Sequence, residues 1–517
     1  MKKVLFHSLV GLVLMVSSLE CSHAMADERA RYTYPPKHEG VYVVAHRGVH
    51  NGIPENTLAA YQKAIDLGCD FIEIDVRTSK DGEYVSIHNS TVDAYVEGIT
   101  GKVEDFTFVE LRAMDIGIKH GEQWKGTKIP TFEEILQLCQ GKIGIYLDLK
   151  NAPVKPLMNL SKQYNMEDRV IWYCDPEEHD EVERLSKQCV SMPDPGPEEN
   201  LQQIIDQFEP TLVASVWRYY SESFVKTCHE AGAMVIVDES DQSCWVDAIA
   251  WGSDGIQTDH PAELIEYLKN YRPQYSKSPN NGGVYVSAHR GVHNGIPENT
   301  LAAYQKAIDL GCDFVEIDVR TTQDGHFVSI HNSTIDAYVD GQTAKVEEMT
   351  LDELRALDIG IKHGVQWAGT QIPTFEEILA LCKDSIGVYI DLKNASVEGL
   401  MPIIKAYDME DQVLWYANAD EMDKIRQLSS RCVSTPNPKS QEDVSAVVKR
   451  FNATFLTTFR GQHSEAMVKA CHENGVIVLA DDRGKESWAD YIAWGTDGIQ
   501  TDYPEELIAL LKTRDKE

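Results

Sequence analysis

The segment AHRGVHNGIPENTLAAYQKAIDLGCDF occupies residues 45–71 and is repeated without a change at residues 288–314, which is 243 positions later. The same offset relates Asp148-Leu149-Lys150 to Asp391-Leu392-Lys393, and residues 254–259 (DGIQTD) to residues 497–502. The register does not slip between these landmarks. The chain is therefore a tandem duplication of one complete domain and not an array of short structural repeats.

The length of the chain agrees with this duplication. A chain of 517 residues divides naturally into two domains of roughly 240 residues, each of which can bury a core of its own. Residues 273–283 are rich in Pro, Ser, Asn and Gly, a composition typical of a linker. We predict a first domain over residues 39–272, a linker over residues 273–283 and a second domain over residues 284–517.

The N-terminus has the pattern of an export signal. Lys2-Lys3 precede an apolar stretch at residues 9–16, and Ala24-Met25-Ala26 fits a signal-peptidase site. We predict a signal peptide over residues 1–26 and a mature protein that is periplasmic or secreted. Lipidation of Cys21 is not expected, because Leu19-Glu20 match a lipidation site poorly. The mature chain has no segment long and apolar enough to predict stable membrane insertion.

The charge of the chain excludes some classes of partner. Its 48 Lys and Arg residues and 82 Asp and Glu residues give a formal net charge of −34. Such a chain gains no counterion release on nucleic acid and is repelled by anionic lipid, so we predict no nucleic-acid partner. An anionic small-molecule substrate would need local positive charge or a bound cation.

The order of secondary structure predicts the fold class. In the first copy we expect strands at residues 41–45, 71–76, 84–87, 143–149, 170–173, 212–216 and 234–237. Amphipathic helices are expected at residues 57–67, 132–138, 177–186, 201–208, 222–230 and 261–268. This alternation over about 240 residues predicts an α/β fold with two tandem (β/α)₈ TIM-type barrels. A doubly wound sheet is the alternative, and Lys80-Asp81-Gly82 predicts one hairpin.

Polar residues lie at the carboxyl ends of several predicted strands, where a barrel assembles its catalytic groups. Glu73, Asp75 and Asp148 come from two such strands. Three carboxylates suit one hard divalent cation, Mg²⁺ or Ca²⁺, better than Zn²⁺. The alternative is a set of buried acids paired with Arg77 or Lys150.

Histidines and cations accompany the acids. His46 and His88 suit general acid-base catalysis, because histidine titrates near neutral pH. Arg47 and Lys150 could hold a phosphate, or else neutralise the acids. His50 and His293 are interpreted as exposed loop residues. The combination indicates phosphoryl transfer, whereas ATP-dependent and serine-hydrolase chemistry lack their motifs.

The repeat resembles the glycerophosphodiester phosphodiesterase family in an ordered set of motifs. These are residues 45–48 (AHRG), 54–57 (PENT), 73–76 (EIDV), 80–82 (KDG) before His88, 91–93 (TVD), 101–103 (GKV), 129–134 (IPTFEE), Asp148-x-Lys150 and 254–259 (DGIQTD). The resemblance implies a phospholipase-C-like barrel that hydrolyses glycerophosphodiesters to glycerol 3-phosphate and an alcohol, with one Ca²⁺ or Mg²⁺ per domain.

The resemblance also implies roles for residues in both copies. The catalytic histidines would be His46, His88, His289 and His331. The phosphate would be held by Arg47, Lys150, Arg290 and Lys393. The metal ligands would be Glu73, Asp75, Asp148, Glu316, Asp318 and Asp391. Asp148 and Asp391 stand where the family usually has Glu, and Asn89 and Asn332 stand where it has Asp. The family's Trp-x-x-Asn pattern is replaced at residues 236–239 and 479–482.

Every one of these site residues is the same in both copies, although the periphery differs, which predicts two working sites. Differences in leaving-group preference are expected from Cys174 against Ala417, and from residues 217–220 against residues 460–463. Two other functions remain open from the sequence. One is a lyase that stops at a cyclic phosphate, and the other is an exported module that only binds phosphodiesters. The oligomeric state is not determined by the sequence.

Overall fold

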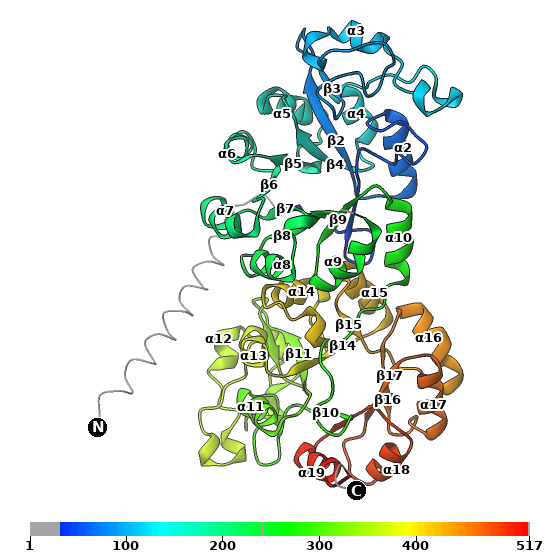
Figure 1. Ribbon diagram of the computed structural model, residues 1–517. Helices are drawn as coiled ribbons and strands as arrows, with labels where there is room; N and C mark the ends of the chain where they lie inside the picture. The colour runs from blue at the N-terminus through cyan, green and yellow to red at the C-terminus, as the bar shows by residue number, and fades with distance from the viewer. Residues whose placement is uncertain (1–31, 240, 515–517) are drawn as a thin grey trace.

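The computed structural model of the protein describes residues 32–239 and 241–514 (Figure 1). The predicted signal peptide, residues 1–26, lies outside the described residues. In the part that the structure describes, no helix is long and apolar enough to cross a membrane.

The first copy forms a nearly closed barrel of eight parallel strands. The path around the barrel is β6-β5-β4-β2-β1-β9-β8-β7, and β3 pairs antiparallel with β2 outside this path. The strands are β1 (Tyr42–Ala45), β2 (Phe71–Thr78), β3 (Tyr84–Ser86), β4 (Gly144–Leu149), β5 (Val170–Cys174), β6 (Val190–Pro193), β7 (Leu212–Val216), β8 (Met234–Asp238) and β9 (Gly255–Thr258). The predicted barrel and the predicted hairpin are both confirmed.

Helices surround this barrel. They are α2 (Leu58–Leu67), α3 (Phe108–Ala113), α4 (Phe132–Cys139), α5 (Val154–Gln163), α6 (Pro176–Leu185), α7 (Leu201–Phe208), α8 (Glu222–Glu230), α9 (Trp245–Trp251) and α10 (Pro261–Asn270). Their ends follow local rules. The α2 helix begins where the Thr57 side chain accepts a hydrogen bond from the Ala60 N–H, and it ends at Gly68, whose φ of 81° suits glycine.

The second copy repeats the architecture, with the path β15-β14-β13-β11-β10-β18-β17-β16 and β12 paired with β11. Its strands are β10 (Tyr285–Ala288), β11 (Phe314–Thr321), β12 (Phe327–Ser329), β13 (Gly387–Leu392), β14 (Val413–Tyr416), β15 (Val433–Ser434), β16 (Phe455–Phe459), β17 (Ile477–Asp481) and β18 (Gly498–Thr501). Its helices are α11 (Leu301–Leu310), α12 (Leu351–Arg355), α13 (Phe375–Cys382), α14 (Val397–Ala406), α15 (Ala419–Leu428), α16 (Val444–Phe451), α17 (Glu465–Glu473), α18 (Trp488–Ala493) and α19 (Pro504–Arg514).

Each barrel has two apolar layers, which decide where the polar side chains point. In the first barrel, one buried cluster fills the interior and includes Tyr42, Phe71, Tyr146 and Ile236. A larger cluster lies between the strands and the helices. Because successive side chains of a strand alternate between its faces, residues two or four positions beyond an interior residue also point inward. Inward-pointing residues at the strand ends therefore line the barrel mouth.

The two barrels touch through the ends at which their strands begin. Lys405 at the end of α14 lies 3.3 Å from Asp254, the residue before β9. Arg431, two residues before β15, lies so close to Gly252 that a Cβ atom there would be 2.9 Å from the guanidinium. Arg426 pairs with Glu39 at 2.8 Å. Figure 1 shows α14 and α15 beside α8 and α9. Neither barrel mouth lines this contact.

Candidate active sites at the two barrel mouths

Three carboxylates meet at the mouth of the first barrel. Glu73 and Asp75 lie on β2 and Asp148 lies on β4, with Asp75 and Asp148 in register. One ligand oxygen of each lies within 4.8 Å of the other two. The side chains of Glu73 and Asp75 are almost completely buried. Burial, together with the charges of Asp75 and Asp148, raises the pKa of Glu73 well above its ordinary value. A bound cation would relieve this repulsion.

Two cations partly offset these acids. The Lys150 Nζ atom lies 2.6 Å from Asp148 Oδ2 and 3.1 Å from Asp75 Oδ1. Burial alone would lower the pKa of Lys150, but these two carboxylates raise it. The Arg47 guanidinium lies 3.2 Å from Glu55 and 3.7 Å from Asp75. Its buried Nε is the atom that faces Asp75, and it forms no hydrogen bond among the described residues.

The backbone after β1 is shaped to bring Arg47 to the acids. Arg47 has a φ of 53°, which is uncommon for a residue other than glycine. This conformation lets its backbone N–H donate to Glu73 Oε2 at 2.7 Å. Gly48 follows with a φ of 78°, and a Cβ atom there would lie 2.8 Å from the Ala60 carbonyl carbon. The glycine of the repeated His-Arg-Gly is therefore required by both conformation and space.

A buried network fixes Asp75 from behind. The Asn56 Nδ2 donates to Asp75 Oδ2 at 2.8 Å. The Asn56 Oδ1 in turn accepts from the Tyr61 hydroxyl at 2.8 Å and from the Ser86 hydroxyl at 3.0 Å. All of these side chains are buried, so the network holds the carboxylate in one orientation. This explains the repeated Glu-Asn-Thr, to which the sequence alone assigned no role.

His46 is held by a carboxylate from the other end of the domain. Its Nδ1 lies 2.7 Å from Asp259 Oδ1, and His50 Nε2 lies 3.0 Å from the same oxygen. A carboxylate accepts hydrogen bonds, so both ring nitrogens donate. These two hydrogen bonds hold the pKa of Asp259 well below its ordinary value. In the neutral His46 ring, Nε2 is then left as a proton acceptor.

His88 approaches the site from the hairpin. It follows β3, and Arg77 fixes its carbonyl oxygen through two hydrogen bonds of 3.0 and 2.7 Å. The His88 Nδ1 lies 2.9 Å from Asn89 Oδ1. Asn89 thus occupies the place that a carboxylate would take beside the second histidine. It can fix the ring but adds no negative charge to it.

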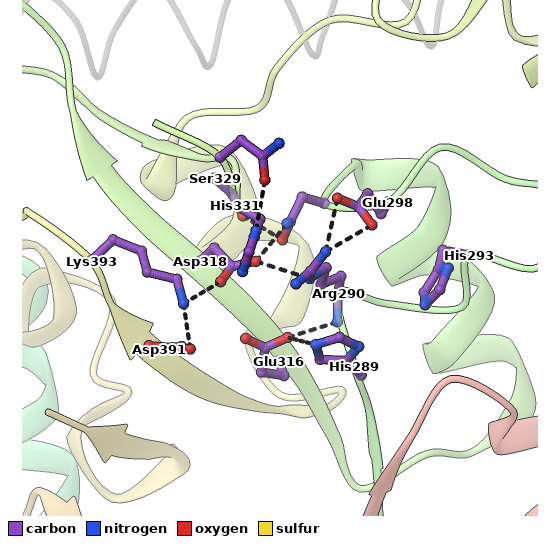
Figure 2. A network of polar contacts seen from close by, with 12 residues as sticks. His289, Arg290, His293, Glu298, Glu316, Asp318, Ser329, His331, Asp391 and Lys393 are labelled. Atoms are coloured by element: carbon purple, nitrogen blue, oxygen red, sulfur yellow. Dashed lines mark hydrogen bonds and ion pairs between the residues drawn. The ribbon is translucent and has the colours of Figure 1, made fainter. Parts of the chain in front are cut away.

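The second barrel has the same geometry (Figure 2). Glu316, Asp318 and Asp391 form the matching carboxylate cluster. Arg290, with a φ of 52°, donates its backbone N–H to Glu316 at 2.7 Å. Lys393 lies 3.0 Å from Asp318 and 2.6 Å from Asp391.

The second pair of histidines also matches the first. The His289 Nδ1 lies 2.6 Å from Asp502 Oδ1, and its Nε2 lies 4.0 Å from Glu316. His293 shares the same Asp502 oxygen at 3.2 Å. The His331 Nδ1 lies 2.8 Å from Asn332 Oδ1. The His289 side chain is 6% exposed against 23% for His46, so the second site is the more enclosed at this position.

Together these groups suit the chemistry of a phosphoryl centre. An all-oxygen cluster suits Mg²⁺ or Ca²⁺, and Arg47 and Lys150 add fixed positive charge beside it. The sequence interpretation of His50 and His293 as exposed loop residues is incomplete, because both contact the carboxylate that holds the first histidine. Asp259 and Asp502 were part of the repeated DGIQTD motif, and that repetition was the signal that could have identified them.

A family model matches both copies. The model described as the glycerophosphoryl diester phosphodiesterase family matches residues 46–175 and 289–506. A glycerophosphodiester phosphodiesterase of Caldanaerobacter subterraneus subsp. tengcongensis is 35% identical over 245 residues, which are 44% of this chain and 97% of that protein. Glycerophosphodiester phosphodiesterase 1 of Bos taurus is 33% identical over 163 residues, 31% of this chain and 48% of that protein.

Solved structures of two phosphodiesterases are similar to this chain at lower identity. An Oleispira antarctica phosphodiesterase in complex with the product sn-glycerol-3-phosphate shares 25% identity, covers 44% of this chain and 96% of its own, and has a TM-score of 0.40. A glycerophosphodiester phosphodiesterase from Agrobacterium tumefaciens shares 23% identity, covers 44% of this chain and 99% of its own, and has a TM-score of 0.41. The family match covers both repeats, and the bacterial relative is covered over nearly its whole length. The chain belongs to the glycerophosphoryl diester phosphodiesterase family.

Proposed function

We propose that each barrel hydrolyses glycerophosphodiesters to glycerol 3-phosphate and an alcohol, with one divalent cation, Ca²⁺ or Mg²⁺, per domain. The observation that supports this proposal is the complete duplication of the histidines, carboxylates and cations in a chain of this family. The small-molecule substrate would bind at each barrel mouth.

The cation would be held by Glu73, Asp75 and Asp148 in the first domain, and by Glu316, Asp318 and Asp391 in the second. When bound, it would stabilise negative charge on the phosphoryl oxygens. Arg47 and Lys150 would add hydrogen bonds and charge on the same group, as would Arg290 and Lys393. Asp148 is one methylene shorter than Glu, and the ion pair with Lys150 keeps its carboxylate at the mouth.

The histidines would move the protons. The glycerol 2-hydroxyl would attack phosphorus, and water would then open the cyclic phosphate. His46 Nε2 would take the proton from the attacking hydroxyl, while Asp259 stabilises the imidazolium that results. His88 would deliver a proton to the leaving alcohol oxygen, with its ring fixed by Asn89. His289 and His331 would do the same in the second domain.

We also propose that the protein is exported and acts in the periplasm or outside the cell. The support is the sequence of residues 1–26. Microsequencing of the N-terminus of protein recovered from the producing cell would test this. A mature chain that begins near Asp27 is expected, and an intact Met1 on the functional protein would contradict export.

Release of glycerol 3-phosphate tests the activity. Mature protein would be incubated with glycerophosphocholine and glycerophosphoethanolamine in the presence of Ca²⁺, Mg²⁺ or EDTA, and ³¹P NMR would separate glycerol 3-phosphate from a cyclic phosphate. The single variants His46→Ala and His289→Ala should each lose part of the activity, and the double variant nearly all of it. His120→Ala and His363→Ala remove exposed histidines in the same two domains and serve as matched controls.

Other results of this assay would indicate a different function. A cyclic phosphate as the final product would indicate a lyase. Tight binding of glycerophosphocholine without turnover, unchanged in the double histidine variant, would indicate a binding protein. No release and no binding by folded protein would contradict the proposed function.

A further inference from the structure

Among the inward residues at the strand ends, the two barrel mouths differ in one half only. In both barrels, the mouth residues from the first two barrel strands and from β4 or β13 are the same. The half formed by β5–β8 in the first domain, and by β14–β17 in the second, is not. We call this half the distal rim. Its inward residues are Tyr173, Asp194, Val216 and Asp238 in the first domain, and Tyr416, Asn437, Phe459 and Asp481 in the second.

The placement of these residues follows from the interior cluster. Ile171, Met192, Ala214 and Ile236 all lie in the barrel interior. The rim residue of each strand is two positions further along, so it points to the same face at the level of the mouth. The strand registers also place these residues at the level of the mouth, because Asp148 pairs with Tyr173 and Val216 pairs with Asp238. The distal rim thus adjoins the proposed phosphate site.

In the first domain the distal rim is acidic and aromatic. The Tyr173 hydroxyl donates to Asp194 Oδ2 at 2.8 Å, and the Tyr173 and Tyr146 rings lie 5.8 Å apart. Burial and the charges of Asp194, Asp148 and Asp238 raise the pKa of the Tyr173 hydroxyl. Burial likewise raises the pKa of Asp238, against the opposing charge of His46. Among the described residues, neither Asp194 nor Asp238 forms an ion pair with a lysine or an arginine.

In the second domain the distal rim has lost this excess of negative charge. Asn437 replaces Asp194, and its Nδ2 donates to the Thr457 carbonyl at 2.8 Å and to Gln462 at 2.9 Å. Asp481 remains, but Arg483 Nε lies 3.8 Å from its Oδ1. Phe459 replaces Val216 and packs against the Tyr416 ring at 5.9 Å. One acid has become neutral, one cation has been added, and the apolar surface has grown.

We infer that the two barrels divide their substrates by the charge of the alcohol: the first domain prefers cationic alcohols such as choline or ethanolamine, and the second prefers uncharged alcohols such as glycerol. A cationic group over Tyr173 and between Asp194 and Asp238 would gain from both the carboxylates and the ring faces. The same group in the second domain would meet Asn437 in place of an acid, and an Asp481 whose charge Arg483 partly offsets. This inference rests on the proposed function of both sites.

Full-length variants with one silenced domain test the inference. His331→Ala leaves the first domain to act alone, and His88→Ala leaves the second. The kcat/KM values for glycerophosphocholine and glycerophosphoglycerol would be measured for each. The ratio of kcat/KM for glycerophosphocholine to kcat/KM for glycerophosphoglycerol should be about tenfold higher for the first domain than for the second. An effect of this size is expected of a partly desolvated cation site.

Reciprocal exchanges at the rim sharpen the test. Asp194→Asn in the His331→Ala protein should lower the ratio several-fold, and it keeps an acceptor for the Tyr173 hydroxyl. Asn437→Asp in the His88→Ala protein should raise the ratio. Asp206→Asn is the matched control, because it removes one carboxylate from the outer surface of α7 and should leave the ratio unchanged. Circular dichroism would verify that each variant is folded.

The results separate this inference from the proposed function. Equal ratios in the two domains, or equal effects of Asp194→Asn on both substrates, would overturn the division by charge while leaving the phosphodiesterase activity in place. A ratio that favours the choline substrate in the second domain would reverse the assignment and overturn it as well. Hydrolysis of neither substrate by the unmodified protein would remove the proposed function, and this inference with it.

Discussion

The Nδ1 atom of His46 lies 2.7 Å from Oδ1 of Asp259, although 213 positions separate the two residues in the chain. The second domain reproduces the pair in His289 and Asp502 at 2.6 Å. Closure of each barrel brings these residues together, because β1 pairs with β9 and β10 pairs with β18. The carboxylate determines which ring nitrogen carries the proton and therefore which one is free to react.

Asp259→Asn should impair the reaction without weakening substrate binding. In a protein that also carries His331→Ala, we expect kcat to fall by about a hundredfold or more and KM to change little, because the wrong tautomer of His46 becomes populated. The unfolding temperature should stay within the range of the parent. His50→Ala, which removes only the second hydrogen bond to Asp259, should lower kcat by only a few fold. An unchanged kcat in Asp259→Asn would rule out this positioning role.

Removal of divalent cations should abolish turnover and lower thermal stability together. Glu73 and Glu316 are buried beside two like charges each, so an ion that binds only the folded state stabilises it. At a concentration of about a hundred times Kd, this stabilisation is about 2.7 kcal/mol. Calorimetry of EDTA-treated protein with and without Ca²⁺ would measure it. The Glu73→Gln, Glu316→Gln protein should no longer respond to Ca²⁺, and full activity in EDTA would argue against a metal enzyme.

Acid should destabilise the second domain through His463. This side chain is 6% exposed and is held between the Thr458 and Thr496 hydroxyls at 2.6 and 2.8 Å. Burial lowers its pKa from 6.5 to about 4, against the opposing charge of Asp482. At a pH between about 4 and 6.5, His463 binds a proton in the unfolded chain but not in the folded chain. Stability present above pH 6.5 is therefore lost as the pH falls towards 4, by about 3 kcal/mol in total.

The first domain supplies the control for this pH effect. Its equivalent residue is Tyr220, which makes a hydrogen bond to Ser253 and does not titrate in this range. His463→Tyr should therefore remove the acid-dependent loss from the second domain. Calorimetric unfolding at pH 7 and pH 4.5 would measure the difference between the two proteins. The same pH dependence in both would show that His463 is not its source.

Lys405→Met should weaken the contact between the barrels. Lys405 and His229 hold the pKa of the buried Asp254 below its ordinary value, although burial alone would raise it. Loss of the lysine leaves this carboxylate with one cationic partner, at a cost of about 2 to 3 kcal/mol. Lys162→Met is the matched change in the first domain, where the lysine is 41% exposed and pairs with Glu167, and it should have little effect. Faster proteolysis within residues 273–283 would report the weakened contact, and equal rates in both variants would contradict it.

Much of this fold could be predicted because periodicity and duplication are local signals. The predicted strand at residues 212–216 and the predicted helix at residues 201–208 match β7 and α7. Two strands were missed. The first, β6, ends in Pro193, and β9 has four buried residues that begin with Gly255, so neither carries an alternating pattern. The helices α3, α5 and α9 were also missed, and in α5 the reason is Pro156, which stands in the first turn, where a helix tolerates proline.

Part of the candidate site could likewise be predicted from the sequence, and part of it could not. The carboxylates and histidines could be proposed because they stand at strand ends within repeated motifs. The repeated DGIQTD motif marked Asp259, but its pairing with His46 could not be predicted, because closure of the barrel brings the two together. The expectation that residues 217–220 set the difference between the domains stays a prediction. Trp217 stacks on Trp251 at 5.4 Å and packs on the layer between strands and helices, whereas Asp194 and Val216 point into the mouth.

The contact through Lys405 and Arg431 has a consequence for kinetics. Since neither mouth opens onto it, a molecule released by one site enters bulk solvent before it can reach the other. The two reactions cannot be channelled, and the rate on a mixed pool of substrates is the sum of two independent rates. Because both sites lie in one chain, they are always present in a ratio of one to one, whatever the amount of protein that the cell makes. The duplication thus sets the ratio of the two sites and not the order in which they act.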